Sequence, residues 1–512
     1  MTEIIETTAN NRRIARNTLF LYIRMLIVMA VSLFTQRVVL DKLGATDYGI
    51  FYAVAGVVAM LGFLNGTLST GTSRFLTFEM GRGDKEKLKN TFSTAFYSHL
   101  ILAAIVVFVL LSGGVWFVEN KLIIPTERID AAIWVLIASV LTTFVSITQV
   151  PYTSVIIARE NMSIYAYIGL FEAFAKLGIV YLLTLSTWDK LIIYSILIAA
   201  VQISIAVFYR FYCVRHYDES HLLHHFDRLI FKNMMAFSSW SLIANISFIL
   251  STQGLTVLMG MFFSPVIVAA QGIGNQINSA LSQFKSNFTT AINPQIIKLY
   301  SVEQYAESRK LTLDSSIYVF DLMLLLSLPI IVLIKPILEL WLVEVPEYAV
   351  VFSQWILISN LFSTYTQMLY VPMIASGKLK ENSYASVFVT IFGFIALYFM
   401  FRAGWDVMWI QYMTLFQIVV YSYIVKPIIL CKYIPDYKPR FFIENTLLML
   451  KVALFPVALS VVIYKFWPVS NLWIMGLQVV IIMFAVGIAA FIFMDKLMRQ
   501  RLLLIVRSKL HL

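Results

Sequence analysis

The chain has 512 residues, of which 60% are hydrophobic and only 13% are charged, and its mean hydropathy is +0.81. Soluble domains are roughly 45–50% apolar and 25% charged, so this composition excludes an ordinary soluble protein. The formal net charge is +11, from 39 Lys and Arg against 28 Asp and Glu. Cations in cytoplasmic loops that face anionic lipid headgroups account for such an excess, so no nucleic-acid partner is expected.

Apolar runs of about 18–25 residues, each long enough to cross a hydrocarbon core of about 30 Å, recur along the whole chain. Fourteen spans are predicted, at residues 17–40, 49–70, 92–117, 131–157, 165–186, 191–213, 234–260, 266–290, 313–334, 349–373, 384–402, 407–430, 446–466 and 472–494. The longest connection, residues 214–233, is too short for a folded catalytic domain. The sequence therefore predicts an all-α polytopic membrane protein that is not an enzyme.

The basic residues predict the orientation of these spans. If both termini are cytoplasmic, 27 of the 39 Lys and Arg residues lie on the cytoplasmic side, 8 on the outer side and 4 within spans. This distribution follows the positive-inside rule. The first span is too long for a signal peptide and lacks a small-residue cleavage site, so we expect it to remain. The two cysteines, Cys213 and Cys431, do not indicate a disulfide framework.

The two halves of the chain resemble each other. Three pairs share one separation of 221 residues: Pro151 with Pro372, Glu160 with Glu381, and Asn161 with Asn382. The predicted organisation is a cytoplasmic tail (1–16), an N-lobe of six spans (17–213), a cytoplasmic linker (214–233), a C-lobe of six spans (234–430), a cytoplasmic loop (431–445), two further spans (446–494) and a basic cytoplasmic tail (495–512). Internal repeats that meet at a binding site are typical of secondary transporters. Since no nucleotide-binding motif is present, we expect alternating access without ATP or another cofactor.

A stripe of polar residues marks the eighth predicted span. Its members follow one another at steps of three or four: Gln271, Asn275, Asn278, Ser282, Lys285, Thr289 and Asn293. At about 100° per residue they share one face of a helix. Such a face turns either toward a water-filled cavity or toward a neighbouring helix that it hydrogen-bonds. The charge of Lys285 favours a cavity, because a packing seam rarely requires a cation.

Other polar residues within spans have two interpretations each. Arg24 either lines the cavity or extends toward the cytoplasmic surface. Glu172 and Lys176 are four residues apart, so they form either a neutralised ion pair within one helix or a pair that exchanges partners during transport. Asp321 either pairs with Lys285 or carries a proton or cation, and the ion pair is the preferred interpretation.

Amide and hydroxyl side chains in the seventh and tenth spans, among them Asn245 and Ser363, suit sugar hydroxyls, although hydrogen bonding between helices explains them equally well. Four histidines lie in the linker 214–233, but apolar residues alternate with them, so an interfacial segment is expected there and no metal site. A cavity with Arg and Lys from both lobes favours an anionic substrate. A diphosphate fits such a cavity better than a cationic drug, because Arg makes bidentate hydrogen bonds to phosphate oxygens and Lys adds a positive point charge.

Five stretches then point to a family: LGATDYGIF, SRFLTFEMGRGD, FKNMMAFSSWSLIAN, FFSPVIVAAQGIGNQINSALSQFKSNFTTAINPQIIKLY and LELWLVEVPEY. They resemble the polysaccharide flippases (Wzx-type) of the multidrug/oligosaccharidyl-lipid/polysaccharide (MOP) exporter superfamily. The resemblance covers nearly the whole chain and departs from the family at Ser264 and Val343, where glycine is usual. It implies a MATE-like fold in the bacterial inner membrane.

The resemblance also implies a function. Such proteins move an undecaprenyl-diphosphate-linked oligosaccharide from the cytoplasmic to the periplasmic leaflet for O-antigen (lipopolysaccharide) or capsule assembly. By this resemblance Arg24 and Lys285 would contact the diphosphate, and Arg74 would gate the cytoplasmic mouth or act as an ordinary positive-inside anchor. The implied partners are the lipid-linked oligosaccharide, membrane lipids, and the polymerase and chain-length machinery of polysaccharide assembly.

Three alternatives stay open. A lipid II flippase of the same superfamily also has fourteen spans and a cationic cavity. A cation-coupled multidrug exporter typically has twelve spans and a cavity for cations, which the basic stripe disfavours. A membrane enzyme such as a polymerase or ligase would require a large outer loop.

Overall fold

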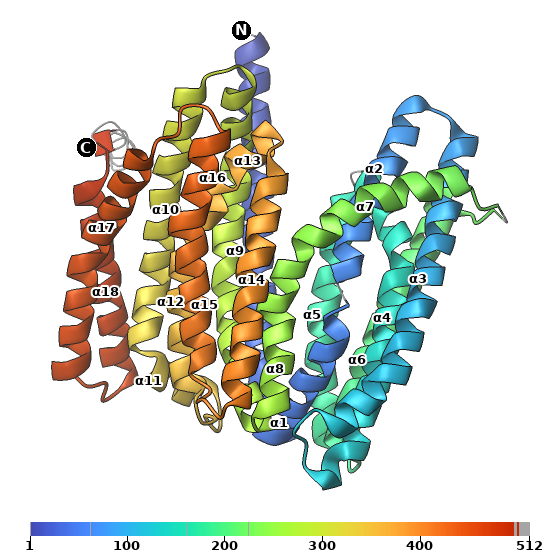
Figure 1. Cartoon of the computed structure of the whole chain (residues 1–512), viewed down its shortest axis with the longest axis horizontal. Coiled ribbons are helices and arrows are strands. Elements are labelled where there is room, and N and C mark those ends of the chain that lie inside the picture. Colours follow the sequence, from blue (N-terminus) through green and yellow to red (C-terminus); the bar gives the residue numbers. More distant parts are fainter. Residues whose placement is uncertain (1, 62, 160, 224, 496–498, 501–512) are drawn as a thin grey trace. The chain divides into compact units, whose positions relative to one another are not determined.

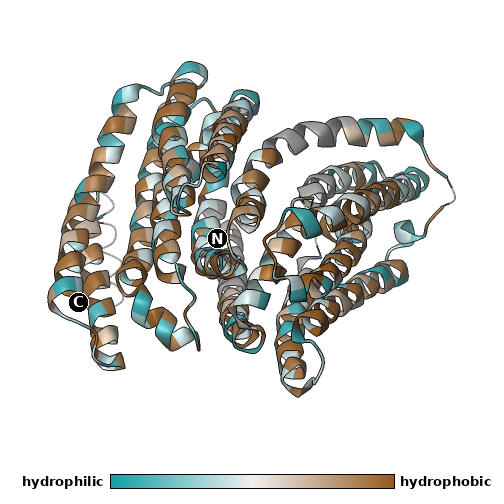
Figure 2. Ribbon diagram, turned by 60° about the horizontal axis from the view of Figure 1, so that its bottom comes forward, coloured by the Kyte–Doolittle hydropathy of each residue, from teal (hydrophilic) through white to brown (hydrophobic). Residues whose placement is uncertain are grey.

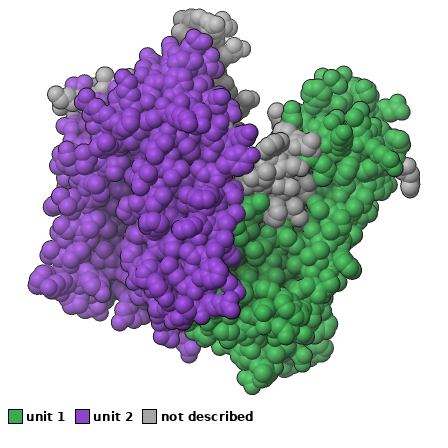
Figure 3. Space-filling model, viewed as in Figure 1, with its two compact units in different colours: residues 1–269 green, residues 270–512 purple. Residues whose placement is uncertain are grey.

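The computed structural model describes residues 2–61, 63–159, 161–223, 225–495 and 499–500. Within these residues all regular secondary structure is helical (Figure 1). The contacts divide the chain into two compact units, residues 1–269 and 270–512 (Figure 3). The predicted lobes 17–213 and 234–430 place their boundary earlier in the chain, and they stay a prediction.

The first unit contains the helices up to α8: α1 (Thr2–Ala59), α2 (Phe63–Arg82), α3 (Lys85–Asn120), η1 (Thr126–Arg128), α4 (Ile129–Ala158), α5 (Met162–Leu185), α6 (Lys190–His216), η2 (Asp218–Ser220), α7 (Arg228–Ile249), η3 (Leu250–Gly254) and α8 (Leu255–Phe262). α4 packs between α3 and α6, while α7 packs on α2 and α8 on α1. The core between α3, α4 and α6 includes Phe92, Tyr152 and Tyr209, which are each less than 5% exposed.

The second unit begins within α9 and contains the remaining helices: α9 (Pro265–Ser301), α10 (Tyr305–Val332), α11 (Ile334–Trp341), α12 (Ala349–Leu369), α13 (Val371–Ser376), α14 (Leu379–Arg402), α15 (Trp409–Val419), η4 (Val420–Val425), α16 (Lys426–Tyr433), α17 (Pro439–Phe466) and α18 (Leu472–Phe493). α10 packs on α12, and α17 and α18 pack on each other and on α10. The two spans outside the repeat therefore join the second unit through α10.

The predicted membrane-spanning architecture is confirmed. Each of the fourteen predicted spans corresponds to one helix or to consecutive helices in the described residues. Nine described helices are long and apolar enough to cross a membrane by themselves: Lys85–Asn120, Thr126–Ala158, Tyr167–Leu185, Lys190–His216, Tyr305–Val332, Lys380–Arg402, Trp409–Tyr433, Pro439–Phe466 and Leu472–Phe493. Hydrophobic residues occupy long stretches of the helices (Figure 2), and side chains such as Phe108, Leu454 and Trp473 are more than 70% exposed. An exposed apolar surface of this extent is typical of a protein that spans a membrane.

Several helices bend, end or are interrupted, both between the predicted spans and within them. α1 changes direction at Gly44, whose φ of 77° and ψ of 167° lie in a region that is essentially restricted to glycine. α12 ends at Leu369, and Pro372 then stands in the first turn of α13, where its missing N–H costs nothing. Two π-helical segments, η3 and η4, interrupt the seventh and twelfth spans. Each π-helical turn contains more residues than an α-helical turn, so it changes the face on which later residues lie.

Candidate functional site

Lys285 lies at the centre of a hydrogen-bonded network between α9 and α12 in the second unit. Its Nζ donates to Oδ1 of Asn360 at 2.6 Å and to Oγ of Ser363 at 3.2 Å. Nδ2 of Asn360 in turn donates to Oγ of Ser282 at 3.2 Å, and Asn360 is only 5% exposed. Among the described residues no carboxylate forms an ion pair with Lys285. In the described part of the chain the Lys285 amine is therefore held by neutral groups, and no carboxylate there offsets its charge.

The other members of the polar stripe divide between packing and unsatisfied groups. Oε1 of Gln271 accepts from Nε2 of Gln411 on α15 at 2.7 Å, which is a contact between helices. Thr289 donates to the backbone carbonyl of Lys285 at 2.8 Å and so stays within its own helix. Oδ1 of Asn278 is buried and has no partner among the described residues, whereas Asn275 is half-buried. The stripe thus serves partly as a packing seam, and Lys285 and Asn278 are its best candidates for ligand contact.

Two predicted site residues, Arg24 and Asn245, belong to α1 and α7, but their side chains lie outside the described part of the structure. Their roles stay predictions. Arg74 is exposed on α2, with its guanidinium carbon 5.8 Å from the centroid of the Phe75 ring. An exposed arginine over an aromatic ring is compatible with both a gate and a positive-inside anchor.

Glu172 and Lys176 form an ion pair within α5, with Nζ 2.7 Å from Oε1 of the carboxylate. Gln202 on α6 donates to the same carboxylate oxygen at 3.1 Å. The structure therefore contains the predicted intrahelical pair, and partner exchange stays a prediction. Asp321 differs from expectation: among the described residues it forms no ion pair with Lys285, and its Oδ1 is buried without a hydrogen-bond partner. Lys285 is engaged by α12 instead, which leaves Asp321 as a candidate for a proton or cation.

Sequence reasoning counted Lys426 with the cytoplasmic cations at the end of the twelfth span and did not predict that its side chain is buried. The structure places it at the start of α16, directly after the π-helical segment η4, where it is 2% exposed. Its Nζ lies 5.2 Å from the centroid of the Tyr370 ring and 5.3 Å from that of Tyr421, within the range of cation–π attraction. Lysine is almost never fully buried unless it is paired, and Lys426 is a buried cation between two tyrosine rings, so it joins the candidate site residues of the second unit.

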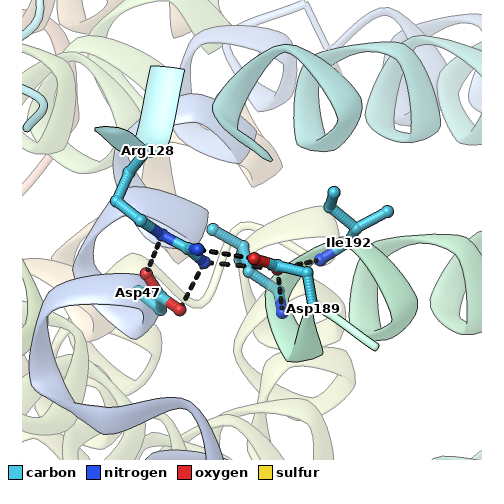
Figure 4. Close-up of polar contacts among 5 residues, drawn as sticks. Asp47, Arg128, Asp189 and Ile192 are labelled. Carbon is cyan, nitrogen blue, oxygen red and sulfur yellow. Dashed lines mark hydrogen bonds and ion pairs between the residues drawn. The ribbon is translucent and has the colours of Figure 1, made fainter. Parts of the chain in front are cut away.

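A second missed feature is an ion cluster in the first unit, formed by Asp47, Arg128 and Asp189 (Figure 4). Arg128 donates to both oxygens of Asp47, from Nε at 2.8 Å and from Nη2 at 2.6 Å. Its Nη1 and Nη2 also bind the two oxygens of Asp189, the latter at 3.2 Å. One guanidinium therefore joins the turn in α1 to the start of α6, and both aspartates lie in segments predicted to face outward.

Asp189 has a second role as the N-cap of α6. Its Oδ1 accepts from the backbone N–H groups of Leu191 at 3.0 Å and Ile192 at 3.1 Å. Burial by itself would raise the pKa of the Asp189 carboxyl, but Arg128 and the two backbone amides outweigh burial and hold that pKa below its usual range. The carboxylate is therefore charged at neutral pH.

No group of three or more His, Cys, Asp or Glu side chains with metal-binding geometry occurs in the described ranges. Three histidines of the linker, His216, His221 and His225, belong to those ranges.

Comparison with solved structures identifies the fold. The lipid II flippase MurJ in an inward closed conformation superimposes with a TM-score of 0.70, over 94% of this chain and 100% of that one, at 13% sequence identity. The chain has the fold of MOP superfamily transporters. A MOP superfamily transporter from Pyrococcus furiosus, described by the reversed polarity of its binding pocket, matches with a TM-score of 0.58 and 14% identity, over 84% of this chain and 95% of that one.

An inward-facing multidrug resistance MATE family transporter of the MOP superfamily matches with a TM-score of 0.56 and 14% identity, over 84% of this chain and 94% of that one. No family model and no curated protein matches the sequence. With its many apolar helices, this MOP-fold chain is a multi-pass membrane protein. At sequence identities of 13–14% the structural match identifies the fold alone, so the substrate has to be inferred from the chemistry of the site.

Proposed function

We propose that this chain is a flippase that moves an undecaprenyl-diphosphate-linked oligosaccharide across the bacterial inner membrane, with both of its termini in the cytoplasm. The observation that carries the proposal is the uncompensated cation of Lys285 on a helix face rich in amides. A cation buried in a membrane protein without a carboxylate is costly, so such residues usually serve a ligand or a pathway. An anionic head group would supply the missing negative charge.

The surrounding groups fit a head group that combines phosphate with sugar. Asn360 and Ser363 already orient the Lys285 amine. Asn278 lies on the same helix as Lys285, and its unpartnered side-chain oxygen would accept a hydrogen bond from a sugar hydroxyl. Lys426 adds a second cation to this unit, and Arg24 stays the proposed cation of the first. Alternating access by two lobes, with a lipid tail outside the head-group site, agrees with the MOP fold. The proposed partners are the lipid-linked oligosaccharide and the polymerase and chain-length machinery that receive it.

A lipid II flippase is the second candidate, since the structure titled lipid II flippase MurJ matches this chain over 94% of its length. Its substrate has the same diphosphate-linked chemistry, so the cationic site does not separate the two candidates. The residues of the five family-like stretches favour the polysaccharide substrate. A cation-coupled exporter is disfavoured because Lys285 would repel a cationic drug.

Complementation tests the proposal. The gene is expressed in a strain without its own polysaccharide flippase, and surface polysaccharide is measured at matched membrane abundance. We expect wild type and Lys285→Arg to restore it and Lys285→Ala to fail. Lys451→Ala is the matched control, because Lys451 also lies within a span but is exposed on α17. It should behave as wild type.

A parallel strain depleted of its lipid II flippase separates the two candidate substrates. Growth rescue there, without polysaccharide at the surface of the first strain, would replace the proposed substrate with lipid II. If Lys285→Ala restores polysaccharide as well as wild type does, the flippase assignment stands and the cationic site is wrong.

A further inference from the structure

A cavity of about 300 Å³ lies between α14 and α16 in the second unit, at the helix ends that are predicted to face the cytoplasm. Its walls combine two kinds of side chain. Val425, Ile428 and Ile429 form an apolar wall, while Glu381 and Lys432 contribute a carboxylate and an amine. Ile428 is 60% exposed, so the apolar wall continues onto the surface that faces lipid. The cavity therefore connects a charged recess with the hydrocarbon region.

The internal repeat provides a second cavity for comparison. In the first unit, a cavity of about 380 Å³ lies between α5 and α6. Four lining residues of each cavity correspond at a separation of 221 residues: Ile164 with Ala385, Ser204 with Val425, Phe208 with Ile429, and Tyr212 with Tyr433. The residue that corresponds to Lys432 is Phe211. The fold thus forms a cavity at this place twice, and no charged residue lines the first-unit cavity in the described part of the chain.

Glu381 supplies the feature of the cavity that points to a ligand. It lies in the first turn of α14, where the helix dipole favours an acidic residue but does not require its burial. Its Oε2 is nevertheless buried and has no hydrogen-bond partner among the described residues. A buried carboxylate oxygen that is left unpaired is strongly unfavourable, so a bound donor is expected at this position.

Lys432 provides the opposite charge in the same cavity. It lies in the last turn of α16 and is exposed, and its Nζ is 5.2 Å from the centroid of the Tyr433 ring. None of the ion pairs in the described residues joins it to Glu381. The carboxylate and the amine therefore line one cavity without pairing with each other, an arrangement that fits a molecule with both charges.

We propose that this cavity binds the head group of an ethanolamine phospholipid from the cytoplasmic leaflet. The primary ammonium of the lipid donates to Glu381, its phosphate accepts from Lys432, and the first methylenes of an acyl chain lie along Ile428 and Ile429. An anionic phospholipid would place its phosphate beside the Glu381 carboxylate with no cation of its own. A choline phospholipid carries the charge but has no N–H group to donate. This site does not depend on the flippase function proposed above.

Lipid retention tests the proposal directly. The protein is purified in mild detergent, exposed to equal amounts of phosphatidylethanolamine, phosphatidylcholine and phosphatidylglycerol with matched acyl chains, and examined by native mass spectrometry. We expect wild type to retain phosphatidylethanolamine preferentially. Glu381→Gln should lower that preference about tenfold, the effect of losing one charge-assisted hydrogen bond. Glu307→Gln, at an exposed glutamate in the first turn of α10, is the matched control and should keep the preference.

A second variant keeps the test decisive if Glu381→Gln folds poorly. Ala385→Leu fills the cavity with an apolar side chain and should also abolish the preference, while the mass spectrum reports whether the protein remains folded. Equal retention of the three lipids by wild type, or a preference for phosphatidylglycerol, would overturn the proposal. An unchanged preference in both Glu381→Gln and Ala385→Leu would place the lipid elsewhere and overturn it as well.

Discussion

The ion cluster of the first unit makes a quantitative prediction for Arg128→Gln. The guanidinium makes four hydrogen bonds to two carboxylates, and the side chains of Arg128, Asp47 and Asp189 are 23%, 18% and 30% exposed. Exposed pairs contribute about 0–1 kcal/mol, whereas breaking a buried pair costs about 3–5 kcal/mol. This cluster lies between those limits, so we expect a loss of about 2 kcal/mol. The two carboxylates that remain would then repel each other across the turn of α1.

Thermal unfolding of the purified protein, followed by tryptophan fluorescence at a fixed scan rate, measures this loss. For domains of this size, about 2 kcal/mol corresponds to a decrease of roughly 4–8 °C. Arg128→Lys should recover only part of the lost stability, since an ammonium cannot make bidentate hydrogen bonds to two carboxylates. Lys121→Gln removes a neighbouring cation that lies over the Trp116 ring, and it should change the midpoint by less than about 1 °C.

A double-mutant cycle separates the pair from its surroundings. If Arg128→Gln and Asp47→Asn are coupled by contact, their combined effect falls short of their sum by about 1 kcal/mol or more. A midpoint for Arg128→Gln within 1 °C of wild type, or strict additivity with Asp47→Asn, would show that the cluster does not stabilise the unit.

Three further predictions concern other positions. A Cβ at Gly49 would overlap the backbone carbonyl of Pro265, so Gly49→Ala should lower the free energy of unfolding by about 1–3 kcal/mol or more, and with it the unfolding midpoint and the membrane abundance. Gly113 has open space around it, so Gly113→Ala should be neutral in the same assays. Lys426→Met removes the cation that lies beside the rings of Tyr370 and Tyr421, and it should reduce complementation at matched membrane abundance; normal complementation would exclude Lys426 from the site. The pKa of Asp189 is lower in the folded protein than in the unfolded chain, where it is about 4, so its charge stabilises the fold fully above about pH 4. This contribution is lost as pH falls through the folded pKa. The difference in unfolding midpoint between wild type and Asp189→Asn should therefore stay constant from about pH 7 to 5 and shrink below about pH 4.

The positions of the spans could be predicted because hydropathy is a property of local sequence. The predicted span 165–186 corresponds to Met162–Leu185 in α5, and the predicted span 472–494 to Leu472–Phe493 in α18. Interruptions within spans were less accessible. The π-helical segment η4 has the sequence VYSYIV, which is as apolar as a regular helix, so no local pattern distinguishes it.

The site could be predicted only in part. Periodicity located Lys285 on a polar face, and Ser363 was among the polar residues of the tenth span, but the choice of partner is a tertiary property that spacing does not contain. Arg128 shows this limit clearly, because its partners lie 81 and 61 residues away and its position only suggested an outward-facing charge. Positive-inside counting grouped Lys426 with the cytoplasmic cations near span ends, and such a count does not contain the information that this side chain is buried.

The π-helical turn before Lys426 has a consequence for how this position tolerates change. Each residue added to or removed from a helix rotates everything after it by about 100° about the axis. The inward direction of Lys426 is therefore set by the number of residues in Val420–Val425 as well as by their identity. Deletion of a single residue there would turn the ammonium toward a different neighbour while the composition of the span hardly changed. The number of residues in this turn thus determines which way the Lys426 side chain points. Substitutions that preserve this number should be tolerated far better than insertions or deletions when both are compared by complementation.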